Sequence, residues 1–102
     1  MDYFLGVDVG TTNIKAAVFN LEGELLAYHS VANVIHHPVP EESNFDPEEL
    51  WENLCICIRT VAAQVGPENI KAVTASSMAE SGVPLDGEGN PLYPIIAWYD
   101  NR

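Results

Sequence analysis

The chain has 102 residues, enough for one small domain, and 47% of them are hydrophobic, so a packed core is expected rather than a disordered tail. Its formal net charge of −11 argues against a nucleic-acid partner, which requires a basic surface. No apolar run approaches the roughly 20 residues that cross a membrane, and the first residues lack the basic region and cleavage site of a signal peptide. We therefore expect a cytoplasmic protein that works away from membranes.

Three antiparallel strands joined by tight turns are predicted at the start of the chain. Residues 3–9 are apolar and rich in strand formers, and residues 13–19 place apolar side chains at alternate positions. A turn at Glu22 and Gly23 leads into a third strand over residues 24–34. Because consecutive strands with short connections pair with each other, these three are expected to form one antiparallel unit.

A helix is predicted to follow a proline-containing loop over residues 35–44. Asp46 is suited to the N-cap, Pro47 to the first helical position, and Glu49 completes a capping box with Asp46. Apolar side chains then recur at helical spacing, at Leu50, Leu54, Ile58 and Val61. Gly66 and the proline after it are expected to end the helix.

The remaining residues predict a fourth strand and a short hairpin. Residues 69–77 have strand composition, and because a helix separates them from the third strand, we expect a crossover that returns to the same sheet. Residues 78–82 are interpreted as a loop. Residues 83–85 and 92–96 are predicted to pair as a hairpin around the sequence DGEGN.

The turn between the first two strands, within GVDVGTTNIKAAVF (residues 6–19), concentrates polar side chains between apolar ones. A sharp turn leaves backbone N–H groups unpaired, and such groups can form a concave site for an anion. Gly10 allows a phosphate to approach the backbone, and Thr11 and Thr12 add hydroxyl donors. Lys15 adds a positive charge three residues later. The simpler alternative is an ordinary hairpin turn, since these residue types are common in turns.

Asp8 ends the first strand beside this turn, where its carboxylate is expected to repel a phosphate. Its position is explained if it holds a hydrated Mg²⁺ ion that bridges to the phosphates. The scarcity of cations supports the same interpretation, because only 4 Lys and Arg residues oppose 15 acidic ones. The glycine spacing fits neither G-x-x-x-x-G-K nor G-x-G-x-x-G, so those two nucleotide-binding folds are not indicated.

The D-x-G-T-T pattern of this turn resembles the first phosphate motif of the actin-like ATPase superfamily. Four further segments follow in the order seen in the FGGY carbohydrate kinases, which include glycerol, xylulose and gluconate kinases: FDPEELWENL, the loop after residue 77, DGEGNPLYPII and WYDNR. The resemblance covers essentially all of the chain, and W-x-D-x-R is its most specific part. It implies an α/β, ribonuclease-H-like half-domain with a mixed sheet of three antiparallel strands, a crossover helix and a fourth strand. Residues 1–102 would be the incomplete N-terminal part of the family's first domain.

Members of this family transfer the γ-phosphoryl group of ATP to a hydroxyl group of a sugar, sugar acid or polyol. The resemblance therefore implies ATP and Mg²⁺ as cofactors and a small-molecule sugar or polyol as substrate. It implies the rest of a kinase chain as a partner, and it is compatible with a homo-oligomer. The family's catalytic base and adenosine-binding segments lie beyond the position of Arg102. We therefore expect no catalytic base in this segment and no activity from it alone.

Individual roles follow from the same resemblance. Asp8 would organise Mg²⁺. The residues that would contact the ATP phosphates are Gly10, Thr11, Thr12 and Lys15. The residues that would bind the substrate are Met78, Ala79, Glu80, Trp98 and Asp100. Glu80 would accept hydrogen bonds from substrate hydroxyl groups, and Arg102 would pair with nearby carboxylates.

Two departures from the family pattern bear on the substrate. Ala79 stands where glycerol kinases carry Arg, which argues against glycerol, and the His that usually follows Met in xylulokinases is absent. Two alternative functions remain open: a non-catalytic binding module built from the same half-domain, and another ATPase of the actin-like superfamily. The second does not account for the W-x-D-x-R ending. Met78 and Trp98 also have a purely structural alternative, since both residue types are common in hydrophobic cores.

Overall fold

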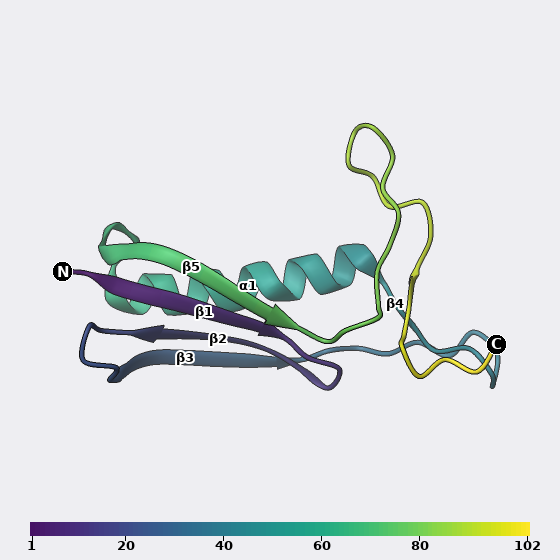
Figure 1. Cartoon of the computed structure of the whole chain (residues 1–102), viewed down its shortest axis with the longest axis horizontal. Helices are drawn as coiled ribbons and strands as arrows, with labels where there is room; N and C mark the ends of the chain where they lie inside the picture. Colours follow the sequence, from purple (N-terminus) through teal and green to yellow (C-terminus); the bar gives the residue numbers. More distant parts are fainter.

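A four-stranded mixed sheet forms the larger part of the computed structural model, which describes all 102 residues (Figure 1). Its strands are β1 (Tyr3–Val9), β2 (Asn13–Phe19), β3 (Leu25–Ala32) and β5 (Ile70–Ser77), in the order β3-β2-β1-β5. β2 pairs antiparallel with both β1 and β3, whereas β5 runs parallel to β1. The predicted antiparallel unit and the return of the fourth strand to the same sheet are confirmed, although β3 is shorter than expected.

The crossover between β3 and β5 passes through α1 (Pro47–Val65), which lies along one face of the sheet (Figure 1). The helix ends at Gly66, whose φ of 88° lies in the region that favours glycine. A short 3₁₀ turn, η1 (Pro67–Asn69), then leads into β5. No helix of the structure combines the length and the apolar character needed to cross a membrane.

Only one half of the capping box predicted at the start of α1 is formed. The Asp46 carboxylate accepts hydrogen bonds from the backbone N–H groups of Glu48 at 2.9 Å and Glu49 at 3.2 Å. The return bond expected from the Glu49 side chain to Asp46 is not formed, because its carboxylate lies 3.0 Å from Nε2 of His36. The full capping box is therefore a wrong prediction, and a contact with the preceding loop replaces half of it.

The hydrophobic core lies between α1 and the sheet. Its buried residues come from three strands and the helix, and they are Leu5, Val7, Ile14, Ala16, Val18, Ala27, Cys57 and Val61. Because side chains alternate along a strand, the residues between them face the other side of the sheet. On that side Phe4, Phe19 and Tyr28 are exposed. One face of the sheet is thus covered by α1, and the other is open.

A second, two-stranded sheet lies near the C-terminus (Figure 1). It pairs β4 (Asn44–Phe45) with β6 (Ile95–Ile96) antiparallel. Phe45 and Ile95 are buried there together with Ala97. The predicted loop over residues 35–44 therefore ends in a strand that the sequence did not indicate.

The segment between β5 and β6 projects from the body of the molecule (Figure 1). The expected hairpin within it is only partly formed, because one isolated bridge joins Leu85 to Pro91 and the isoleucines of β6 pair elsewhere. Three prolines in this segment lack the N–H that a longer ladder needs, at positions 84, 91 and 94. The predicted turn is formed, and the Asp86 carboxylate stabilises it by accepting hydrogen bonds from the backbone N–H groups of Glu88 and Asn90 at 2.8 and 2.9 Å.

Candidate functional site

The turn between β1 and β2 presents two backbone donors without a partner. The N–H of Gly10 donates to the carbonyl oxygen of Asn13 at 2.9 Å, whereas the N–H groups of Thr11 and Thr12 donate to no group of the chain. A Cβ at Gly10 would lie 2.9 Å from the same carbonyl oxygen, so the turn requires glycine. Two consecutive free N–H groups beside two hydroxyl groups form a suitable site for an anion.

Asn33 fixes this turn from the residue that follows β3. Its backbone N–H donates to the carbonyl oxygen of Thr12 at 2.9 Å, and its Nδ2 donates to the carbonyl oxygen of Gly10, also at 2.9 Å. The side chain is buried. Sequence reasoning missed Asn33, because one Asn at the end of a predicted strand gives no signal for partners more than 20 residues earlier.

Asp8 lies on the open face of the sheet, between two polar neighbours. It is directly opposite Lys15 on β2 and Ser76 on β5. The Ser76 hydroxyl donates to Asp8 Oδ1 at 3.1 Å, and the other carboxylate oxygen accepts no hydrogen bond within the chain. These three side chains, with Thr74 and Tyr28, line part of a hollow of about 370 Å³. One carboxylate oxygen is thus free to bind a cation next to the turn.

A second hollow, of about 350 Å³, brings the phosphate turn and the predicted substrate loop together. It is lined by Thr11, Met78, Ala79, Glu80 and Trp98. The indole N–H of Trp98 donates to the Thr11 hydroxyl at 3.1 Å, and that hydroxyl in turn lies 3.8 Å from the Met78 sulfur. Four of the five predicted substrate residues therefore share one hollow, and Thr11 connects them to the turn.

Glu80 has an unusual backbone within this hollow. It is the only residue other than glycine with a positive φ, at 58°. Such a conformation costs of order 1 kcal/mol or more for a residue with a Cβ, and it is concentrated at functional sites. The side chain is exposed and accepts no hydrogen bond within the chain, so it is free to accept one from a ligand.

Asp100, the fifth predicted substrate residue, does not lie in the hollow. Its side chain is only 4% exposed, and its carboxylate is bonded to Arg102 at 2.8 Å and to the backbone N–H of Ser43 at 2.6 Å. Hydrogen bonds from Arg102 hold the pKa of this carboxyl well below its usual range. The expected pairing of Arg102 with carboxylates is confirmed, and Glu42 is its second acidic partner at 3.1 Å.

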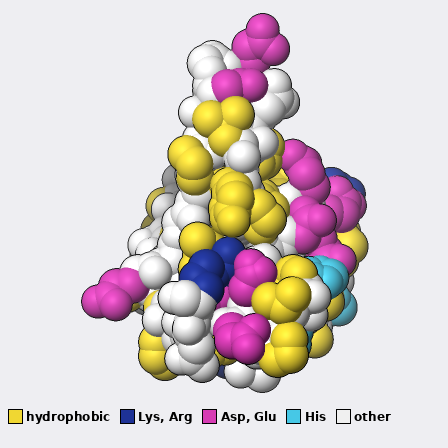
Figure 2. All heavy atoms as spheres, turned by 90° about the vertical axis from the view of Figure 1, so that its right-hand side faces the viewer, with side chains coloured by type: hydrophobic (Ala, Val, Ile, Leu, Met, Phe, Trp, Pro, Cys, Tyr) yellow, Lys and Arg dark blue, Asp and Glu magenta, His cyan; other side chains and the backbone are white.

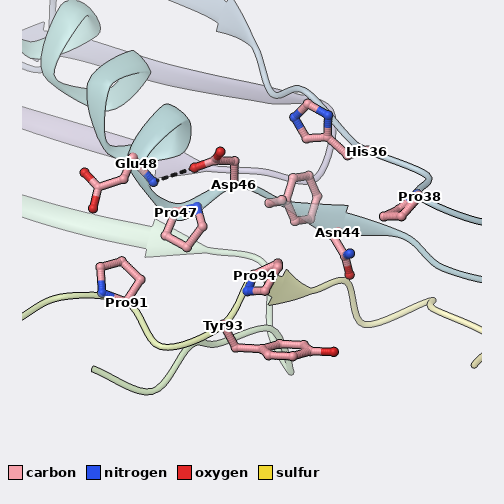
Figure 3. Close-up of a pocket in the computed structure, with 10 residues that line it drawn as sticks. His36, Pro38, Asn44, Asp46, Pro47, Glu48, Pro91, Tyr93 and Pro94 are labelled. Atoms are coloured by element: carbon pink, nitrogen blue, oxygen red, sulfur yellow. Dashed lines mark hydrogen bonds between the residues drawn. The ribbon is translucent and has the colours of Figure 1, made fainter. Parts of the chain in front are cut away.

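A further hollow, of about 400 Å³, contains none of the predicted site residues (Figure 3). It lies where the start of α1 faces the segment after the projecting turn, and Figure 3 shows the Asp46 carboxylate bonded to Glu48 beside it. Prolines at positions 38, 47, 91 and 94 form much of its wall, together with Tyr93. No pattern in the sequence indicated this hollow.

Comparison with known proteins identifies the family. Residues 3–102 match the sequence model described as "FGGY family of carbohydrate kinases, N-terminal domain". A glycerol kinase of Citrifermentans bemidjiense is 36% identical over 105 residues, which cover 100% of this chain and 21% of the relative. A gluconokinase of Bacillus subtilis is 30% identical, covering 98% of this chain and 20% of that protein. The chain thus spans about a fifth of the length of the curated relatives it matches.

Solved structures give the same result for the fold. A ligand-bound xylulose kinase from Lactobacillus acidophilus superimposes with a TM-score of 0.90 at 25% identity, over 99% of this chain and 20% of that one. A xylulose kinase from Rhodospirillum rubrum gives a TM-score of 0.88 at 25% identity, over 98% of this chain and 21% of the other. The expected ribonuclease-H-like arrangement of the actin-like ATPases is confirmed. The chain therefore belongs to the FGGY family of carbohydrate kinases and matches its N-terminal domain.

Proposed function

We propose that this chain is the incomplete N-terminal part of an ATP-dependent carbohydrate kinase, and that it holds the ATP phosphates and one wall of the substrate pocket. The observation that carries the proposal is the position of Thr11. Its backbone N–H faces no partner in the phosphate turn, while its hydroxyl contacts Trp98 and Met78 of the second hollow. A kinase must bring a phosphate and an acceptor hydroxyl together, and Thr11 belongs to both parts of such a site.

The phosphates would be bound mainly by neutral donors. The turn supplies the N–H and hydroxyl groups of Thr11 and Thr12, with Gly10 allowing close approach, and Lys15 is the nearby cation. The donor set also fits Mg²⁺, which prefers oxygen ligands and retains waters, because Asp8 keeps one free carboxylate oxygen. When bound, the ion would neutralise charge that develops on the transferred phosphoryl group.

The substrate wall has the character of a polyhydroxy-compound site. Glu80 offers a free carboxylate to hydroxyl groups, and Trp98, a residue that is 55% exposed, offers a flat apolar ring. Ala79 continues to argue against glycerol, although several matched relatives are glycerol kinases.

We expect Glu80→Ala to raise the KM for the sugar about 10- to 100-fold while the KM for ATP changes less than twofold. A hydrogen bond to a charged acceptor contributes about 1.5–3 kcal/mol, and Glu80 lines the hollow proposed for the substrate and makes no hydrogen bond to the turn. Steady-state kinetics of the kinase polypeptide with each substrate varied in turn would measure both constants. Equal effects on the two KM values would assign Glu80 a structural role instead.

The proposed function is tested by Thr11→Val in the kinase polypeptide that carries this segment. We expect kcat/KM to fall about tenfold or more, because the substitution removes the hydroxyl that contacts Trp98 and Met78. Thr60→Val is the matched control, since the Thr60 hydroxyl only bonds a carbonyl oxygen of its own helix. The assay follows ADP release with pentuloses, hexonates and polyols.

Two results would contradict the proposal. Unchanged kinetics in Thr11→Val would separate the turn from the reaction. Sugar binding without phosphorylation in the parent polypeptide would favour a non-catalytic binding module.

A further inference from the structure

The turn that carries Trp98 is attached at both ends to one residue of a distant loop. The backbone N–H of Asp100 donates to the carbonyl oxygen of Ala97 at 3.0 Å, which closes a four-residue turn with Trp98 and Tyr99 at its centre. The N–H of Ala97 donates to the carbonyl oxygen of Ser43 at 2.9 Å, and the N–H of Ser43 donates to the Asp100 carboxylate at 2.6 Å. Ser43 thus holds the residues on both sides of the aromatic pair.

Arg102 completes this attachment. Its guanidinium donates to both oxygens of Asp100 at 2.8 Å, and it also reaches the side chains that flank Ser43. Those partners are Glu42, at 3.1 Å, and the side-chain oxygen of Asn44. Figure 2 shows this end of the molecule, where basic side-chain atoms lie against acidic ones on the surface. The Arg102 guanidinium therefore connects the Asp100 carboxylate to the loop that contains Ser43.

Trp98 itself has few contacts that would hold its ring. It is 55% exposed, its indole N–H bonds the Thr11 hydroxyl, and its ring meets Tyr99 edge-on at a centroid distance of 5.2 Å. An exposed indole on an unsupported turn would sample several orientations. The direction of the ring is consequently set by the turn beneath it.

We propose that Asp100 is a positioning residue, which fixes the Ala97–Asp100 turn on Ser43 so that Trp98 stands across the hollow and bonds Thr11. The inference rests on the proposed function for the role of Trp98, but the contacts that carry it are internal to the chain. Asp100 is thereby assigned a positioning role instead of the predicted role of substrate ligand, because both of its carboxylate oxygens accept hydrogen bonds and its side chain is almost fully buried.

The indole N–H resonances of the 102-residue chain provide a direct test. The chain has two tryptophans, so a ¹⁵N–¹H spectrum contains two indole signals, and Trp51→Phe assigns them. In Asp100→Asn we expect the Trp98 signal to move at least halfway to its position in the denatured chain, since Asn loses the charge that binds Arg102. Thr11→Val should give a similar displacement, because it removes the acceptor of the same N–H.

Asp86→Asn is the matched control. Asp86 also accepts backbone N–H groups within a turn, but that turn lies in the projecting segment and shares no hydrogen bond or ring contact with Trp98. We expect its Trp98 signal to coincide with that of the parent chain. If Asp100→Asn fails to fold by circular dichroism, Arg102→Gln is measured instead, because it removes the same ion pair from the other side.

The result that overturns the inference is a folded Asp100→Asn chain with an unmoved Trp98 signal. In the kinase polypeptide, the same variant should raise the sugar KM about tenfold, and combining it with Trp98→Ala should add little to the effect of Trp98→Ala alone. Additive effects would make Asp100 an independent ligand and contradict the inference. Because the spectrum is recorded without sugar or ATP, failure of the kinase proposal leaves the spectral test intact.

Discussion

Asp8→Asn is expected to lower the kcat of the kinase polypeptide at least about 100-fold while the KM for sugar stays within about twofold. The substitution keeps the shape of the side chain and an oxygen for the Ser76 hydroxyl, so the pairing of β1 with β5 is preserved. It removes the negative charge that would hold Mg²⁺ near the phosphates. Electrostatic stabilisation of a transition state is worth several kcal/mol, whereas substrate binding in the other hollow does not use this carboxylate.

The measurement is a steady-state titration with Mg²⁺ at saturating ATP and sugar. Partial recovery of the rate at high Mg²⁺ would support a role in binding the metal, because excess ion compensates for a weakened site. Asp86→Asn, on the projecting turn, is the control for loss of one surface carboxylate and should keep the parent rate. A parent-like kcat in Asp8→Asn at every Mg²⁺ concentration would remove Asp8 from the metal site.

The isolated 102-residue chain is expected to phosphorylate no sugar at a useful rate. A base must reach the attacking hydroxyl; Asp100 is engaged with Arg102 and Ser43, and Glu80 is proposed to bind substrate. The turn would hold ATP by its phosphates alone, which poorly offsets the entropy lost on binding. The hollow beside Thr11 is open to solvent, so water would compete with the sugar for the phosphoryl group.

A coupled assay of ADP release on the purified chain, with the same panel of pentuloses, hexonates and polyols, decides this prediction. The control is the kinase polypeptide assayed in parallel. A sugar-dependent rate within about tenfold of a typical kcat near 10 per second would contradict the prediction. Such a rate would require a base among these residues, and Glu80→Gln would then be the first variant to assay.

Much of the fold could be predicted because its signals are local. The alternation of apolar and other side chains predicted β2, and the N-cap residue Asp46 followed by Pro47 predicted the start of α1. The single helix between strands predicted that the fourth strand returns to the same sheet, whereas its parallel pairing with β1 came from the structure. By contrast, β4 and β6 have two residues each, and their paired residues are 50 and 52 positions apart, so no local pattern could define their register.

The site divides in the same way. Gly10 and the two threonines after it were recognisable because the turn they form is contiguous in the sequence. Asn33 and Ser43 were missed because their function is to bond distant backbone atoms, and an isolated Asn or Ser gives no indication of such a partner. Asp100 was placed in the pocket by its motif, whereas the structure engages its carboxylate elsewhere.

The contacts that join the two parts of the site span most of the chain. Thr11 is separated by 67 positions from Met78 and by 87 from Trp98, and Asp8 by 68 from Ser76. Contacts between such distant positions form late in folding, because the entropy of closing long loops opposes them. During synthesis, the phosphate turn can form once β1, β2 and Asn33 have emerged, but the hollow cannot form before Trp98 has done so. We therefore expect nascent chains that end before this residue to contain the anion site without the substrate wall.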